Sequence, residues 1–126
     1  MSDLKRESID NRPLRAPLLR FSIDKEIDRM KKESSWIDGD RDAITLQKNS
    51  SLRVVLITMH KGAVLHKHKV EGPITVFVLS GKIIFSAGDD KTNASENELI
   101  VLEKTIPHDV EALEDAVFIL TIIQPK

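Results

Sequence analysis

The 126-residue sequence contains no cysteine and no tyrosine, and its aromatic residues are limited to four Phe and one Trp. Without cysteine the chain has no disulfides, no thiolate metal site and no cysteine nucleophile. A bound metal ion would therefore need histidine or carboxylate ligands. Without tyrosine, proton transfer by a phenol is excluded as well.

An excess of charge of one sign and long apolar runs are also missing. Lys and Arg number 19 against 20 Asp and Glu, a formal net charge of −1, which argues against a nucleic-acid-binding scaffold. No apolar run approaches the roughly 18 residues of a membrane span, and residues 1–20 contain no apolar signal-peptide core. We therefore expect a cytoplasmic protein with no nucleic-acid and no membrane partner.

The length and the change in composition along the chain predict one folded domain after a tail. Residues 1–20 are polar, contain Pro13 and Pro17 and show no periodicity, which is typical of a flexible N-terminal tail. The single domain is expected over residues 21–126.

A short helix is predicted at about residues 22–34, at the start of this domain. Ser22 stands at an N-cap position, and acidic residues come early in the segment and basic residues late, as the helix dipole favours. Apolar residues follow Ser22 at helical spacing, namely Ile23, Ile27 and Met30.

From about residue 41 to residue 123 the apolar period changes to two, which is typical of β-strands. Short strands at near-regular spacing, separated by turn signals and with no helical pattern between them, predict an all-β antiparallel sandwich or barrel and exclude a βαβ enzyme fold. The predicted strands are 42–48, 52–59, 64–70, 73–80, 82–87, 98–103, 107–113 and 116–123.

The alternation within the strands predicts which histidines face inward. In the 107–113 strand His108 shares a face with Val110 and Ala112, and in the 64–70 strand His66 and His68 share a face with Val64 and Val70. Three of the four histidines are thus expected on the buried side of the barrel.

Two further strands, 73–80 and 116–123, are apolar on both faces. Their outer faces must be covered by the N-terminal helix, by a second subunit or by both, so we expect a homodimer.

Burying three imidazoles without partners would cost on the order of 1 to 3 kcal/mol each, so something must satisfy them. A His-x-His strand aims two imidazoles at one point, and His108 from a second strand would complete a three-histidine set for a divalent transition metal: Fe, Mn, Ni or Zn. The alternative is three neutral core histidines that are hydrogen-bonded to hydroxyls, backbone or water.

At these residues the sequence resembles the cupin superfamily of small, RmlC-like β-barrels. Gly62, His66, His68 and Gly81 stand in the order of the first cupin motif, and His108 stands in the setting of the second. The resemblance implies a double-stranded β-helix, or jelly-roll barrel, which is usually dimeric. It also implies that these three histidines are metal ligands.

The chain departs from the cupin pattern at the carboxylate ligand. Ile74 stands where the family carries its metal-binding Glu, and Glu71 is either a substitute ligand from the loop or an exposed turn residue. A site of three histidines alone resembles that of cupins such as the thiol dioxygenases.

Three functions fit this pattern. The first is a small metal-dependent enzyme, dioxygenase- or isomerase-like, of unknown substrate; no inward-facing Asp, Glu, Lys or Tyr is predicted to serve it as a general base. The second is a non-catalytic barrel that binds a small molecule or a metal in its cavity. The third is a metal-free structural dimer. His60 is interpreted as an exposed turn residue, and Trp36 and Phe85 as packing residues.

Overall fold

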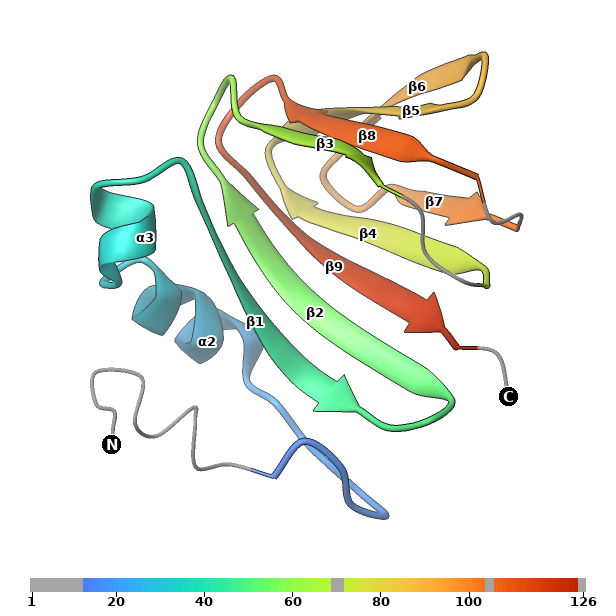
Figure 1. Cartoon of the computed structure of the whole chain (residues 1–126). Helices are drawn as coiled ribbons and strands as arrows, with labels where there is room; N and C mark the ends of the chain where they lie inside the picture. The colour runs from blue at the N-terminus through green and yellow to red at the C-terminus, as the bar shows by residue number, and fades with distance from the viewer. Residues whose placement is uncertain (1–12, 69–71, 104–105, 125–126) are drawn as a thin grey trace.

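The computed structural model describes residues 13–68, 72–103 and 106–124, and for Lys67 and His68 the backbone alone. This part of the chain forms two short helices followed by strands that continue to its end (Figure 1). The elements are α2 (Ile23–Met30), α3 (Ser34–Ile37), β1 (Arg41–Lys48), β2 (Leu52–Met59), β3 (Val64–His68), β4 (Ile74–Ser80), β5 (Lys82–Ala87), β6 (Asp90–Ser95), β7 (Leu99–Leu102), β8 (His108–Ala112) and β9 (Ala116–Ile123).

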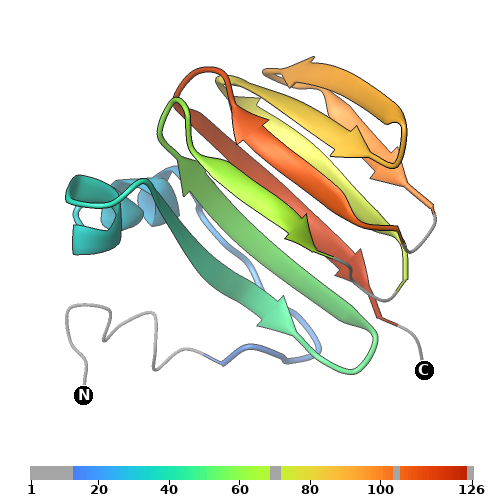
Figure 2. The same ribbon diagram turned by 45° about the horizontal axis from the view of Figure 1, so that its top comes forward.

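The strands form two antiparallel layers. The first is a five-stranded sheet in the order β1-β2-β9-β4-β7, and the second is a four-stranded sheet in the order β3-β8-β5-β6. Figure 2 shows β3, β8 and β5 lying across the first sheet, with the helices beside β1 at one end. This is the all-β jelly roll with a short N-terminal helix that the sequence predicts.

The alternation of apolar residues builds two cores on the two faces of the five-stranded sheet. On the inner face Ile57, Val76 and Phe118 pack between the layers. On the outer face Met30 of α2 packs against Leu56 and other apolar side chains of β1, β2 and β9. The apolar outer face of β9 is thus covered in part by the N-terminal helix, which was one of the expected coverings.

The predicted strands correspond to eight of the nine strands that the described residues form. The strand that was not predicted, β6, is an edge strand in which Ala94 is buried and Asp90–Asn93 are exposed, so it carries no apolar alternation. The predicted helix at 22–34 was too long. The chain leaves α2 after Met30 through a turn in which the Lys32 and Glu33 N–H groups donate to carbonyls three residues back.

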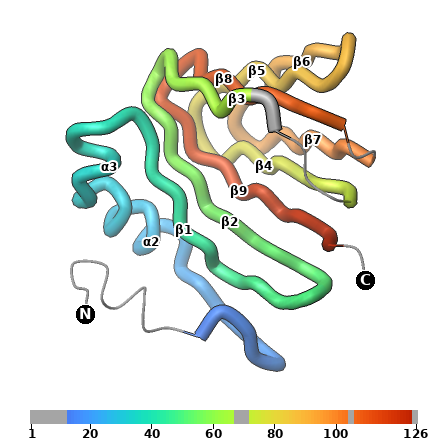
Figure 3. Tube along the Cα trace, viewed as in Figure 1, coloured from blue at the N-terminus to red at the C-terminus, as the bar shows by residue number. Residues whose placement is uncertain are grey.

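The segment 13–20 is irregular and runs past the end of β1 before it enters α2 (Figure 3). The backbone N–H of Lys48, at the end of β1, donates to the carbonyl of Leu14 at 2.8 Å. Within the described residues neither helix is long and apolar enough to cross a membrane.

Candidate functional site

His66, His68 and His108 lie toward one end of the two layers, which we call the mouth. Two connections cross between the sheets there: β3 ends at His68 before β4 begins at Ile74, and β7 ends at Leu102 before β8 begins at His108. The mouth is therefore formed by the ends of β3 and β7 and the beginnings of β4 and β8.

His108 is the best-defined side chain of the mouth. It is 3% exposed and stacks on Phe85 with ring centroids 5.4 Å apart. Its Nδ1 lies 3.1 Å from the carbonyl oxygen of Ile106. A carbonyl oxygen can only accept, so Nδ1 carries a proton, and in the neutral form of the ring the lone pair would stand on Nε2. The predicted burial of His108 on the inner face is confirmed.

The face predicted for His66 is wrong. Leu65 pairs with Val110 and packs against the inner core, whereas His66 is exposed. The cause is a register shift between Leu65 and His68, which places three residue steps on β3 against two on β8. A bulge of this kind inserts one residue, so strict alternation along the whole strand fails.

The same shift sets the backbone of His68 directly opposite His108 in the β3–β8 ladder. The side chain of His68 lies outside the described residues, as do Val70 and Glu71, the possible substitute for the missing carboxylate ligand. Among the side chains that the structure describes, no three His, Asp or Glu residues form a group that could hold a metal ion.

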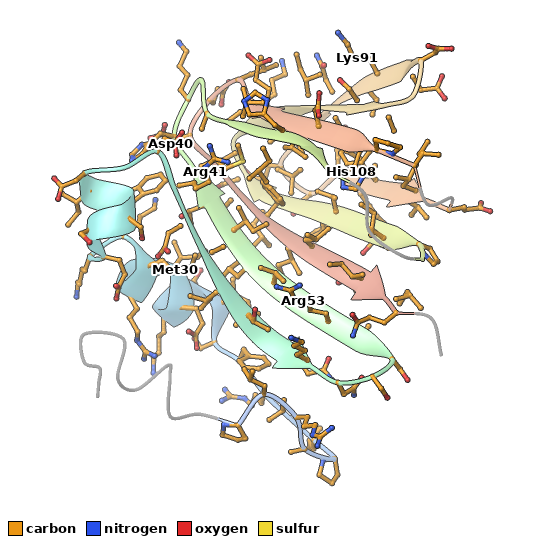
Figure 4. All side chains as sticks on the ribbon, viewed as in Figure 1. Met30, Asp40, Arg41, Arg53, Lys91 and His108 are labelled. Atoms are coloured by element: carbon orange, nitrogen blue, oxygen red, sulfur yellow. The ribbon has the colours of Figure 1, made fainter. Side chains whose placement is uncertain are left out.

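Arg53 is a residue of the inner face that the sequence analysis missed. It pairs with Ile122, a buried residue of the inner core, and it alternates with Val55 and Ile57 along β2. Figure 4 labels Arg53 on β2 and His108 on β8, so the two come from opposite layers. The inward face of Arg53 could have been predicted from the alternation of the strand, because its odd-numbered residues face inward and Arg53 is the first of them.

A cavity of about 200 Å³ opens beside the mouth, between β5, β6 and β7. Phe85 contributes to its wall and stacks on His108. The other lining side chains are mainly apolar, and Asp90 and Lys91 supply charge at its rim. The ring of Phe85 would stand between a small molecule in this cavity and His108.

His60 lies at the opposite end of the barrel and is not the simple exposed turn residue that was predicted. It is half-buried, its ring stacks on Trp36 at 3.5 Å between centroids, and its Nε2 lies 2.8 Å from the Trp36 carbonyl oxygen. Its Nδ1 lies 3.5 Å from a carboxylate oxygen of Asp115. These contacts attach α3 to the barrel.

Asp40 follows α3 and lies beside this cluster. The side-chain hydrogen bond from Arg41 lowers the pKa of Asp40, and the same bond raises the pKa of Arg41. Both groups therefore stay charged near neutral pH, as an exposed ion pair with Nε and Oδ1 2.9 Å apart. It lies away from the mouth and plays no part in the candidate site.

Several solved structures are similar to this chain in fold. An RmlC-like cupin from Desulfovibrio desulfuricans is 26% identical over 71% of this chain and 87% of its own, with a TM-score of 0.62. A conserved protein of unknown function from Streptococcus pyogenes is 24% identical over 68% of this chain and 75% of its own, with a TM-score of 0.65. An RmlC-like cupin family protein with a double-stranded β-helix fold from Methanocaldococcus jannaschii is 11% identical over 67% of this chain and 80% of its own, with a TM-score of 0.62.

A search of curated proteins gave no match. The family model described as "Cupin domain" matches residues 55–123, which is more than half of the 126 residues. The matched segment begins within β2, continues to the end of β9 and contains His66, His68 and His108. The chain belongs to the cupin family.

Proposed function

We propose that this cupin binds a divalent transition metal through His66, His68 and His108 and accepts a small molecule at the mouth of its barrel. The observation that carries the proposal is the setting of His108: a buried imidazole whose Nδ1–H donates to the Ile106 carbonyl, on a residue directly opposite His68.

The donor set suits such an ion. Metal-binding histidines usually donate one ring N–H to a carbonyl or carboxylate, which fixes the tautomer and orients the other nitrogen. The Ile106 carbonyl does this for His108. Neutral imidazoles suit Fe, Mn, Ni or Zn, and the identity of the ion follows from the test below.

His66 is the third proposed ligand. It is exposed, and it lies within the irregular stretch of β3 that directly precedes His68. Because His66 does not share the inner face of Leu65, its side chain would have to turn toward the mouth to bind an ion beside His108, and a bulge is a feature that re-aims side chains in this way. When bound, an ion with open coordination positions would polarise a chelating ligand or a water molecule.

A non-catalytic binding barrel is the second candidate, and the composition of the inner face favours it. Among the described residues the buried polar or charged side chains are Glu26, Asp42, Thr58 and His108. Of these, His108 belongs to the inner face at the mouth, whereas Asp42 and Thr58 pair with each other at the far end of β1 and β2. Asp109 follows His108 and has a buried Oδ1, but the alternation of β8 puts it on the other face, so no carboxylate on the inner face of the described strands stands beside His108 to transfer protons.

The test is the metal content of untagged protein after purification and after loading with each candidate ion. We expect about one ion per chain in the wild type and a sharp loss in His108→Ala and in His66→Ala, because each removes a ligand. His60→Ala is the matched control, since it removes an imidazole outside the mouth and should leave the metal content unchanged. Equal metal content in all four proteins would refute the site, and circular dichroism would show whether each variant is folded.

A further inference from the structure

Arg53 is a cation on the inner face of the barrel, at the same end as His108. It lies one residue into β2, opposite Ile122 near the end of β9, and Ile122 in turn pairs with Ile74 at the beginning of β4. The mouth includes the beginning of β4, so the paired residues Arg53, Ile122 and Ile74 lie at the mouth.

The guanidinium of Arg53 is poorly satisfied by the protein. Its Nε is buried and has no hydrogen-bond partner among the residues that the structure describes. Within residues 13–68, 72–103 and 106–124, Arg53 forms no ion pair with a carboxylate. Leaving a buried donor of a charged group without a partner is costly, so the position calls for a reason other than stability.

The residue across the ladder adds to the positive charge. Lys48 of β1 is the direct partner of Arg53, and directly opposed residues of an antiparallel pair lie on the same face. Two like charges in this arrangement destabilise the pair. Neither cation forms an ion pair with a carboxylate of the described residues, and two such cations at the mouth are the arrangement expected of an anion-binding site.

We infer that Arg53 binds the anionic group of the ligand that enters this mouth and that this ligand is a small carboxylate. The inference deepens the proposed function, because it gives the chemical class of the molecule that the histidine site would receive. Arg53 and Lys48 do not depend on a metal, however, so their part can be tested by itself.

A carboxylate fits Arg53 better than a phosphate does. The Nε–H and one Nη–H of a guanidinium form a planar fork that matches the two oxygens of a carboxylate, and here the Nε side of the fork is the one without a partner. Apart from Lys48, the neighbours of Arg53 on this face include Val55 and Ile122, which are apolar and suit a short hydrocarbon chain.

The experiment is an NMR titration of metal-free, EDTA-treated protein with valerate, with its neutral counterpart valeramide and with inorganic phosphate. The Arg53 Nε–H resonance reports contact between the guanidinium and the ligand's carboxylate, and the methyl resonances of Ile122 and Val55 report contact with its hydrocarbon chain. We expect valerate to shift all three saturably and valeramide to shift none. Loss of the charge-assisted pair in Arg53→Gln should weaken valerate binding by about tenfold or more.

Arg41→Gln is the matched control, because Arg41 lies at the other end of the β1–β2 pair and its guanidinium is already paired with Asp40. It should bind valerate as the wild type does. Arg53→Met separates binding from folding: it should abolish the valerate shifts without lowering the melting temperature, since it removes an unsatisfied donor.

The inference is overturned if valerate causes no saturable shift, if valeramide or phosphate shifts the Arg53 resonance as strongly, or if Arg53→Gln binds valerate unchanged. If valerate binds to metal-free protein and the metal-content tests are negative, the carboxylate site at Arg53 is supported and the histidine metal site is refuted. If the protein binds one metal ion per chain and does not respond to valerate, the histidine metal site is supported and the carboxylate site at Arg53 is refuted.

Discussion

Gly81 joins β4 to β5 and has a backbone conformation and surroundings that exclude a side chain. Its φ is +81°, in the region that L-residues rarely adopt. A Cβ at this position would lie 2.7 Å from the Cα of Ala116 and would also clash with the carbonyl of Asp115. Both neighbours are backbone atoms, of the first residue of β9 and of the residue before it, so they cannot move aside as a flexible side chain could.

We therefore expect Gly81→Ala to lower the free energy of unfolding by about 2–4 kcal/mol, through strain at positive φ and through the clash. Urea unfolding followed by circular dichroism measures this loss. Gly62→Ala is the matched control: its φ is +90°, but nothing lies within 4 Å of an added Cβ, so it should lose about 1–2 kcal/mol through strain alone. Equal losses in the two variants would contradict the role assigned to the clash.

The candidate site shows what alternation can and cannot predict for single residues. His108 lies in a regular strand, so its inward face followed from Val110 and Ala112. His66 stands beside a register shift that no local pattern marks, and its predicted face was wrong. Arg53 was overlooked because a charged residue at the start of a strand resembles the end of a loop, although its position places it on the inner face.

At the scale of elements, the His60 side chain helps to hold α3 to the barrel. Trp36, the single tryptophan of the chain, stacks on His60, and its carbonyl accepts a hydrogen bond from the His60 ring. His60 follows β2 directly, and Asp115, which faces its other ring nitrogen, precedes β9. Lys31 lies over the Trp36 ring at 5.5 Å. The helix of four residues has little stability of its own, so this contact positions it.

We expect His60→Ala to release Trp36 and to lower the free energy of unfolding by about 1–2 kcal/mol, from the lost ring stacking and hydrogen bond. The emission maximum of Trp36 should move to longer wavelength as the ring enters water. His66→Ala, which removes an exposed imidazole at the other end of the barrel, is the control and should leave the emission unchanged. An unshifted emission maximum in His60→Ala would show that α3 is held by other contacts.

The elements that the sequence predicted well are those with a buried face. Strands β1, β2, β4, β5, β7, β8 and β9 lie within a residue of their predicted bounds, because each has side chains that alternate between the core and the outside. β6 offered no such signal, and the break after Met30 had none either, since charged residues on both sides of it are compatible with a continuing helix. Tertiary contacts, not local preference, decide these cases.

At the scale of the whole molecule, the five-stranded sheet is covered unevenly. On its outer face α2 packs over β1, β2 and β9 and buries Val117. At the other edge, Leu99 and Val101 of β7 are each 58% exposed, and Ile123 at the end of β9 is 43% exposed. The helix thus supplies only part of the covering that the apolar outer faces require.

We propose that a second copy of the chain covers the β7 edge in a homodimer. β7 is the last strand of its sheet, and its sequence Leu-Ile-Val-Leu contains none of the charges or prolines that protect exposed edge strands. An edge of this kind is self-complementary, since two copies can pair antiparallel about a two-fold axis and bury the same side chains on both. The cavity beside the mouth is lined by β7 as well, so such a dimer would place both cavities near the interface.

Light scattering after size-exclusion chromatography at micromolar concentration tests this arrangement. We expect the wild type to have twice the mass of one chain and the double variant Leu99→Lys/Val101→Lys to have the mass of one chain, because two lysines on the edge strand oppose both burial and strand pairing. Ile37→Lys is the matched control: Ile37 is 63% exposed on α3, away from β7, and the same charge there should leave the dimer intact. A monomeric wild type would exclude the dimer, and a dimeric Leu99→Lys/Val101→Lys variant would move the interface to another face of the barrel.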